Sequence, residues 1–118
     1  MLNMEERINI NVSAIDYEKT SKKIQQTLGR LEEMVHGQDD FVITDSEFAF
    51  GWHFYIVSVN RQLVQKLSNQ LGAEFENLKG RGLDKKFLTW LNNQVTDKDT
   101  KVKFAIKEEM ESSKFGIF

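Results

Sequence analysis

The chain has no cysteine and no proline among its 118 residues. The absence of cysteine excludes disulfides, thiolate nucleophiles, iron–sulfur clusters and every cysteine-based zinc site. The seven glycines complete neither a dinucleotide fingerprint nor a phosphate-binding P-loop, which excludes nucleotide-binding enzymes of those classes. We therefore expect no cofactor and no metal.

The chain also lacks a large excess of charge of either sign, since 16 basic and 18 acidic residues leave a net charge of -2. No strong positive field draws such a chain to nucleic acid or to an anionic membrane, so we expect neither as a partner. The longest nearly apolar run, residues 48–57, is too short to span a bilayer, and the first residues resemble no secretory leader. These absences predict a cytoplasmic protein.

The overall composition is typical of one globular domain covering residues 1–118, with 40% hydrophobic and 29% charged residues. Its last segment, residues 108–118, combines an acidic run with Phe115, Ile117 and Phe118. We expect this tail to be flexible or to form an interface.

Hydrophobic spacing in the first part of the chain predicts a strand followed by a helix. Polar and apolar residues alternate from Arg7 to Val12, as in a half-buried strand. Ser13 is then expected to cap an amphipathic helix that ends near Gly37. Gly29 lies inside this helix, where it either allows the close approach of a neighbour or bends the helix.

The second part predicts a hairpin, two helices and a last strand. Residues 41–59 are rich in β-branched and aromatic side chains, and the turn is expected at Asp45–Ser46 in preference to Gly51. The second of these strands is apolar on both faces and should be central in its sheet. The remaining elements are expected at residues 63–71, 83–95 and 101–107.

The order β-α-β-β-α-α-β matches the ferredoxin-like α+β fold, in which an antiparallel four-stranded sheet has helices packed on one face.

Four carboxylates gather around the expected hairpin, at Asp39, Asp40, Asp45 and Glu47. Their spacing fits no calcium loop, which leaves a solvated hairpin tip or an acidic surface that imitates nucleic acid or meets a basic partner. Trp90 lies one residue off the apolar stripe of its helix and should be half-exposed, as interface anchors often are. We predict that these five residues contact a partner.

His53 is one of two histidines and lies among aromatic residues. With a turn at Asp45–Ser46, strand pairing places Asp40 beside His53, which begins a general-base arrangement without an assigned nucleophile. A half-buried structural histidine explains the same residue.

A basic loop before the last helix is a candidate anion site. Free backbone N–H groups and nearby cations suit phosphate, while a charged, solvated loop is the commoner explanation. The cations are Lys79, Arg81, Lys85 and Lys86.

Four aromatic residues, Phe48, Phe50, Trp52 and Phe54, alternate through the hairpin. An RNA-recognition sheet stacks bases on such side chains, but its motif requires a basic residue and a glycine before the first aromatic. Residues 48–57 contain neither Lys nor Arg. We therefore expect these aromatic side chains to fill the core.

The expected helix followed by residues 40–43 (Asp-Phe-Val-Ile) and residues 50–55 (Phe-Gly-Trp-His-Phe-Tyr) is similar to small bacterial immunity proteins of the YrhB type. The similarity covers about a third of the chain, and two helices stand where that family would have further strands. It implies binding to a larger protein.

Three classes of function follow from these features. The leading hypothesis is a small protein-binding module that occludes a larger macromolecule, as an immunity protein, an antitoxin or a phage-encoded inhibitor does. The second is a homo-oligomeric assembly or accessory subunit that associates through its sheet edge or its apolar tail. The third is a small enzyme that uses His53 with Asp40 on an anionic substrate held by Lys79 and Arg81.

Overall fold

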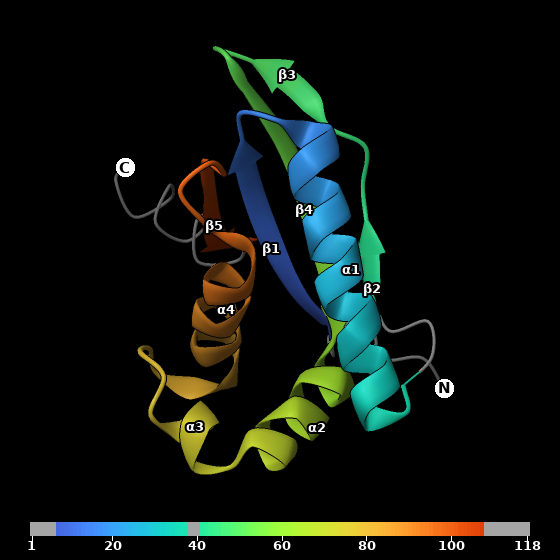
Figure 1. The fold of residues 1–118 in the computed structure, drawn as a ribbon, viewed down its shortest axis with the longest axis vertical. Coiled ribbons are helices and arrows are strands. Elements are labelled where there is room, and N and C mark those ends of the chain that lie inside the picture. Colours follow the sequence, from blue (N-terminus) through green and yellow to red (C-terminus); the bar gives the residue numbers. More distant parts are fainter. Residues whose placement is uncertain (1–6, 38–40, 108–118) are drawn as a thin grey trace, which may run out of the picture.

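A computed structural model of the chain describes residues 7–37 and 41–107. These residues form two layers, an antiparallel sheet and a set of helices that pack on one of its faces (Figure 1). Asp39, Asp40 and the tail at residues 108–118 lie outside the described residues, so the predictions about them stay predictions.

Two long strands occupy the centre of the sheet, β1 (Arg7–Ala14) and β4 (Trp52–Asn60), which pair antiparallel over the whole length of β1. β5 (Val102–Ile106) lies beside β1, while β2 (Phe41–Ile43) and β3 (Glu47–Ala49) share the other edge beside β4. The order β2-β4-β1-β5 is that of the split β-α-β arrangement. The ferredoxin-like α+β prediction is confirmed, with the second strand divided in two.

Within the described residues the helices are α1 (Tyr17–Val35), α2 (Arg61–Leu71), α3 (Ala73–Glu76) and α4 (Gly82–Val95). None of these helices has both the length and the apolar character that crossing a membrane requires. The short α3 was not predicted, because four residues are too few to show a periodic pattern.

The cap of α1 differs from the prediction. The Asp16 carboxylate accepts a hydrogen bond from the Lys19 N–H at 3.0 Å and so satisfies a free donor of the first turn. Ser13 is not the cap, because β1 continues through Ala14 and Ser13 pairs with Phe54 in the sheet.

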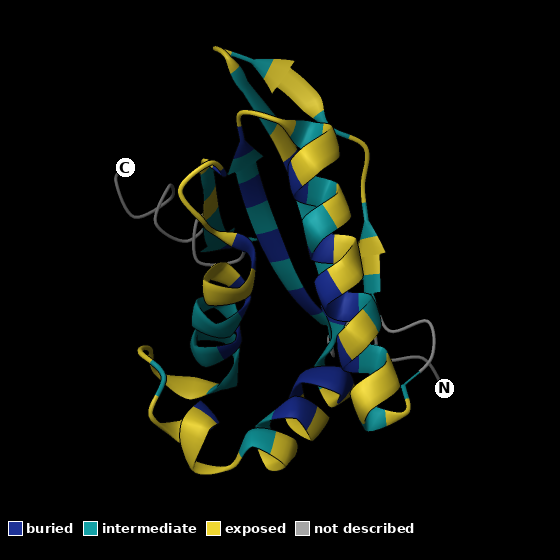
Figure 2. Ribbon diagram, in the orientation of Figure 1, coloured by how far each residue is buried: buried dark blue, intermediate teal, exposed yellow. Residues whose placement is uncertain are grey.

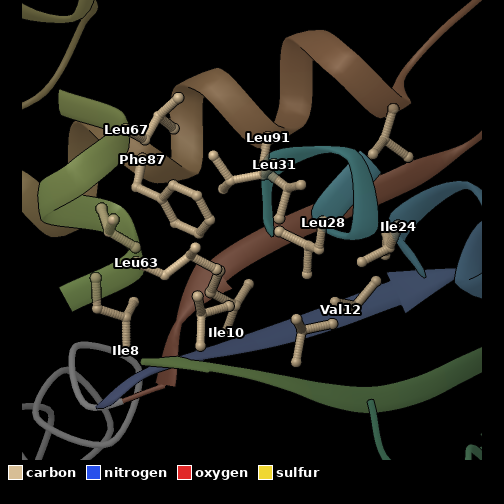
Figure 3. Close-up of a cluster of buried hydrophobic side chains, with 14 of the residues drawn as sticks. Ile8, Ile10, Val12, Ile24, Leu28, Leu31, Leu63, Leu67, Phe87 and Leu91 are labelled. Atoms are coloured by element: carbon tan, nitrogen blue, oxygen red, sulfur yellow. The ribbon is translucent and has the colours of Figure 1, made fainter. Parts of the chain in front are cut away.

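The core lies between the sheet and the helices. Buried and partly buried residues alternate along β1, so the described helices cover one face of the sheet and none of them packs on the other (Figure 2). Each fully buried Leu, Ile, Val or Phe side chain contributes about 1.5–3 kcal/mol, which makes this layer the main source of stability. The core side chains labelled in Figure 3 are Ile8, Ile10, Val12, Ile24, Leu28, Leu31, Leu63, Leu67, Phe87 and Leu91.

The hairpin between β3 and β4 turns at Phe50–Gly51, between the paired residues Ala49 and Trp52. Phe50 has a φ of 55° and Gly51 a φ of 84°, and positive φ at both central positions identifies a type I′ turn. The prediction of a turn at Asp45–Ser46 was wrong, because these two polar residues interrupt the edge strand instead.

Gly29 lies in the middle of α1, and a Cβ atom added there meets no atom within 4 Å, which excludes a close approach. We predict that Gly29→Ala raises the free energy of unfolding by up to about 1 kcal/mol, because alanine restricts the unfolded chain and favours the helix. Urea unfolding followed by circular dichroism measures this change.

The control for this prediction is Gly80→Ala. Gly80 has a φ of +116°, and its added Cβ would lie 2.6 Å from the Cβ of Lys85, so this variant should be destabilised. A Gly29→Ala variant with an unchanged or lower urea midpoint would contradict the prediction.

Candidate functional site

A β-bulge divides the edge strand beside β4. Before it, the Thr44 N–H donates to the Ile56 carbonyl at 2.9 Å, and the Thr44 hydroxyl accepts from the Ile56 N–H at 2.8 Å. Pairing resumes where Glu47 lies opposite Phe54, so residues 45–46 oppose a single residue of β4. The extra residue reverses the alternation of the edge strand and turns Glu47 toward the face without helices.

Side chains from α1 and β4 fix the bulge in place. The Tyr17 hydroxyl donates to the Thr44 carbonyl at 3.1 Å, and Ser46 Oγ shares a hydrogen bond of 3.2 Å with His53 Nδ1. The His53 ring also lies against Phe48, with centroids 4.8 Å apart, and 6.1 Å from the centroid of Tyr17. We interpret His53 as a packing residue that holds the start of the hairpin.

The corrected turn also changes the expected partner of His53. His53 lies opposite Phe48 in the pairing of β3 with β4. Phe41, which follows Asp40 in the sequence, lies opposite Val59 near the other end of β4. The turn on which the expected pairing of Asp40 with His53 depended was therefore wrong, and Asp40 itself lies outside the described residues.

Beyond the bulge, the hairpin extends past the N-terminal end of α1 (Figure 1). It carries exposed aromatic side chains. Phe50 at the turn is 96% exposed, Phe48 is 66% exposed and Phe54 is 40% exposed. The prediction that these side chains fill the core was wrong, because the helices cover only one face of the sheet and end short of the hairpin.

Two of the four predicted carboxylates, Asp45 and Glu47, are exposed beside these rings. Together they form what we call the hairpin surface: Asp45, Glu47, Phe48 and Phe50. Trp90 is partly buried, as expected, with its ring stacked on Phe87 at a centroid distance of 5.8 Å. Since α4 packs against β5, at the opposite edge of the sheet, Trp90 is not part of the hairpin surface.

The predicted basic loop lies at the other end of the molecule from the hairpin (Figure 1). The Lys86 ammonium donates to the carbonyls of Glu76 and Leu78 at 2.6 Å and 2.8 Å, which satisfies acceptors where α3 ends. Lys86 thus has a structural role. Anion binding stays a prediction for Lys79, Arg81 and Lys85.

A second candidate surface is the partly exposed face of the sheet opposite the helices, which we call the open face. No element of the described residues packs on it. Lys103 Nζ lies 5.3 Å from the ring centroid of Trp52 there, a cation–π contact. A hollow of about 340 Å³ lies between the bulge and the central strands. From β1 and β4, the open face presents Arg7, Asn9, Asn11, Ser13, Trp52, Phe54, Ile56 and Ser58.

Neither metal chemistry nor a known relative identifies the protein. Within residues 7–37 and 41–107, no three His, Asp or Glu side chains are grouped as a metal ion would require. The chain matches no protein-family model, no curated protein and no solved structure. The hairpin surface and the open face are therefore the features of the molecule that bear on its function.

Tyr55 lies opposite the bulge and buries a polar group. Its side chain is 4% exposed, and its hydroxyl has no hydrogen-bond partner among the described residues. The ring meets that of Tyr17 edge-on, with centroids 4.9 Å apart. Burial raises the pKa of the Tyr55 hydroxyl well above its ordinary value, and the neighbouring Tyr17 raises it further.

We predict that Tyr55→Phe stabilises the protein by about 1 kcal/mol at neutral pH, because it removes an unpaired buried hydroxyl and keeps the ring. Because the pKa of Tyr55 is raised, its hydroxyl stays protonated in the folded wild type at a pH at which it ionises in the unfolded chain. Ionisation of Tyr55 therefore has no effect on the stability of the wild type below about pH 10 and lowers it progressively as the pH rises above that value. The variant should therefore lose less stability than the wild type in this alkaline range. Urea unfolding from about pH 7 to pH 11 tests both statements, and a destabilised variant at neutral pH would contradict the first.

Proposed function

We propose that the chain is a small protein-binding module that occludes a larger macromolecule, and that it contacts this partner through the hairpin surface. The observation that carries the proposal is the conformation and exposure of Phe50.

Phe50 is 96% exposed and adopts a φ of 55°. The first central position of a type I′ turn favours Asn, Asp or Gly, because a residue with a large side chain is destabilised by about 1–2 kcal/mol in the left-handed region. Phe50 thus stabilises neither the turn nor the core. An aromatic ring at a projecting tip is well suited to anchor an interface, so partner binding accounts for a residue that folding disfavours.

The composition of the hairpin surface indicates the chemistry of the partner. The rings of Phe48 and Phe50 suit an apolar pocket. Asp45 and Glu47 suit basic residues around that pocket, since complementary charge steers association and suppresses wrong partners. Because the hairpin extends beyond α1, it is shaped to enter a concave site, and a tip that fills such a site blocks it.

We predict that Phe50→Asn separates folding from binding. An Asn-Gly type I′ turn relieves the backbone strain, so the free energy of unfolding should rise by about 1 kcal/mol. Loss of the anchoring ring should weaken partner binding by about 30-fold. Tagged wild type and variant are used to capture proteins from a lysate of the native host, and the captured partner is then purified and titrated with each.

Met34→Asn is the matched control, because Met34 is 43% exposed on α1, away from the hairpin. It should leave the captured protein and its affinity unchanged. A photo-crosslinking residue at position 50 should label the partner, whereas the same residue at position 34 should not. A partner bound equally well by the wild type and by Phe50→Asn would overturn the proposed contact.

We predict that Asp45→Lys slows association with the purified partner and that added salt reduces the difference, because long-range attraction between exposed charges is screened. Stopped-flow or biolayer measurements between about 50 mM and 500 mM salt separate the association rate from the dissociation rate. Glu33→Lys makes the same charge change on an exposed part of α1 and serves as the control. Equal association rates for the two variants at low salt would exclude a specific role for Asp45.

A further inference from the structure

We infer that the open face of the sheet binds a second copy of this chain and forms a symmetric dimer. The inference goes beyond the proposed function, since Phe50, which carries that proposal, lies at the turn and is not part of the open face, although Glu47 belongs to both surfaces. It rests on three properties of that face: the order of charges across it, the alternation of large and small side chains, and its composition.

Strand pairing arranges the side chains of the open face in rows that cross the sheet. One row runs from Lys103 on β5 through Ser13 on β1 and Phe54 on β4 to Glu47 on β3. Lys103 and Glu47 are both exposed. The row therefore has a cation at one end, an anion at the other, and a small residue beside an aromatic ring between them.

This row is complementary to itself when it is reversed. A two-fold axis that runs parallel to the strands, between β1 and β4, places Glu47 of one copy against Lys103 of the second copy. The same operation places Phe54 against Ser13 of the second copy, and each contact occurs twice. An axis perpendicular to the strands would place Glu47 against Glu47, so the charges favour the parallel axis.

The shape of the face agrees with the same arrangement. Large side chains of β4 stand beside small or polar side chains of β1, since Phe54 pairs with Ser13 and Ile56 pairs with Asn11. The hollow of about 340 Å³ is bounded by these same residues together with the bulge. Under the two-fold axis, the Phe54 ring of each copy lies over this part of the other copy, where a ring has room to pack.

The size and composition of the face suit a weakly associating dimer. The eight residues of β1 at about 3.4 Å each, and four strands about 4.8 Å apart, give a face of roughly 27 Å by 19 Å. The resulting upper limit of about 500 Å² on its area is below the 800 Å² that each partner buries in a standard interface and corresponds to a small, weakly associating one. Its apolar stripe, Trp52, Phe54 and Ile56, lies between polar and charged residues, as an interface core lies within its rim.

Sedimentation velocity with the full chain tests the inference. The wild type at tens of micromolar should contain a species of twice 13.8 kDa. Glu47→Lys and Lys103→Glu each place like charges at both contacts and should weaken self-association at least about 10-fold. Mixing these two variants restores opposite charges at both contacts, so the mixture should associate within about 3-fold of the wild type.

The self-association restored in the mixture cannot come from a contact between positions 47 and 103 of the same chain. Glu47 and Lys103 lie on strands at opposite edges of the sheet, about 14 Å apart at the spacing of neighbouring strands. A wild-type chain that stays monomeric at about 200 µM would overturn the inference. A mixture that associates no more than either variant alone would overturn it as well.

Two further variants address the apolar contact and the independence from the hairpin. Phe54→Lys should abolish the dimer, while Met34→Lys, at a residue of similar exposure on α1, should leave it intact. Circular dichroism and urea midpoints establish that each variant is folded. Phe50→Asn should dimerise like the wild type, which distinguishes a failure of the dimer from a failure of hairpin binding.

Discussion

The antiparallel pairing of β1 with β4 is the constraint on which the rest of the structure depends. It buries Ile8, Ile10 and Val12 beneath the helices and leaves the intervening residues on the open face. A slip of one residue would move this buried set into solvent, so the core itself holds the register. The same register places Ser13 opposite Phe54 and thereby creates the row of side chains that makes the open face self-complementary.

The parts of the fold that depend on periodicity were predicted from the sequence. β1, α1, α2, α4 and β5 each repeat their buried residues at the spacing of a strand or a helix, and the split β-α-β order followed from them. The bulge was missed because one extra residue leaves no periodic signal. Asp45–Ser46 has the composition of a turn and Phe50–Gly51 does not, so the turn was misplaced. The expected pairing of Asp40 with His53 lost its basis in consequence.

The candidate site was only half predictable for a related reason. β4 is apolar on both faces and is central, as expected, but the sequence does not show that every described helix packs on the same face. Phe48 and Phe54 were therefore assigned to the core, although the carboxylates beside them were recognised from their clustering. The signal that received too little weight was Gly51, because glycine readily adopts the positive φ that a two-residue hairpin turn requires.

The two proposed surfaces share Glu47 at the bulge but differ in their anchoring residues. The bulge turns Glu47 toward the open face, while Phe50 at the end of the hairpin stays outside the inferred interface. A two-fold axis parallel to the strands keeps the direction of every strand, so both hairpins of the dimer project from the same end. A partner with two equivalent sites at a matching separation would then be held at both, and the second contact would form at the high effective concentration of a linked pair. Because the strained turn at Phe50 is formed within one chain, dimerisation leaves the conformation of each hairpin unchanged. In this arrangement the dimer strengthens binding to a partner with two sites only by linking the two hairpins.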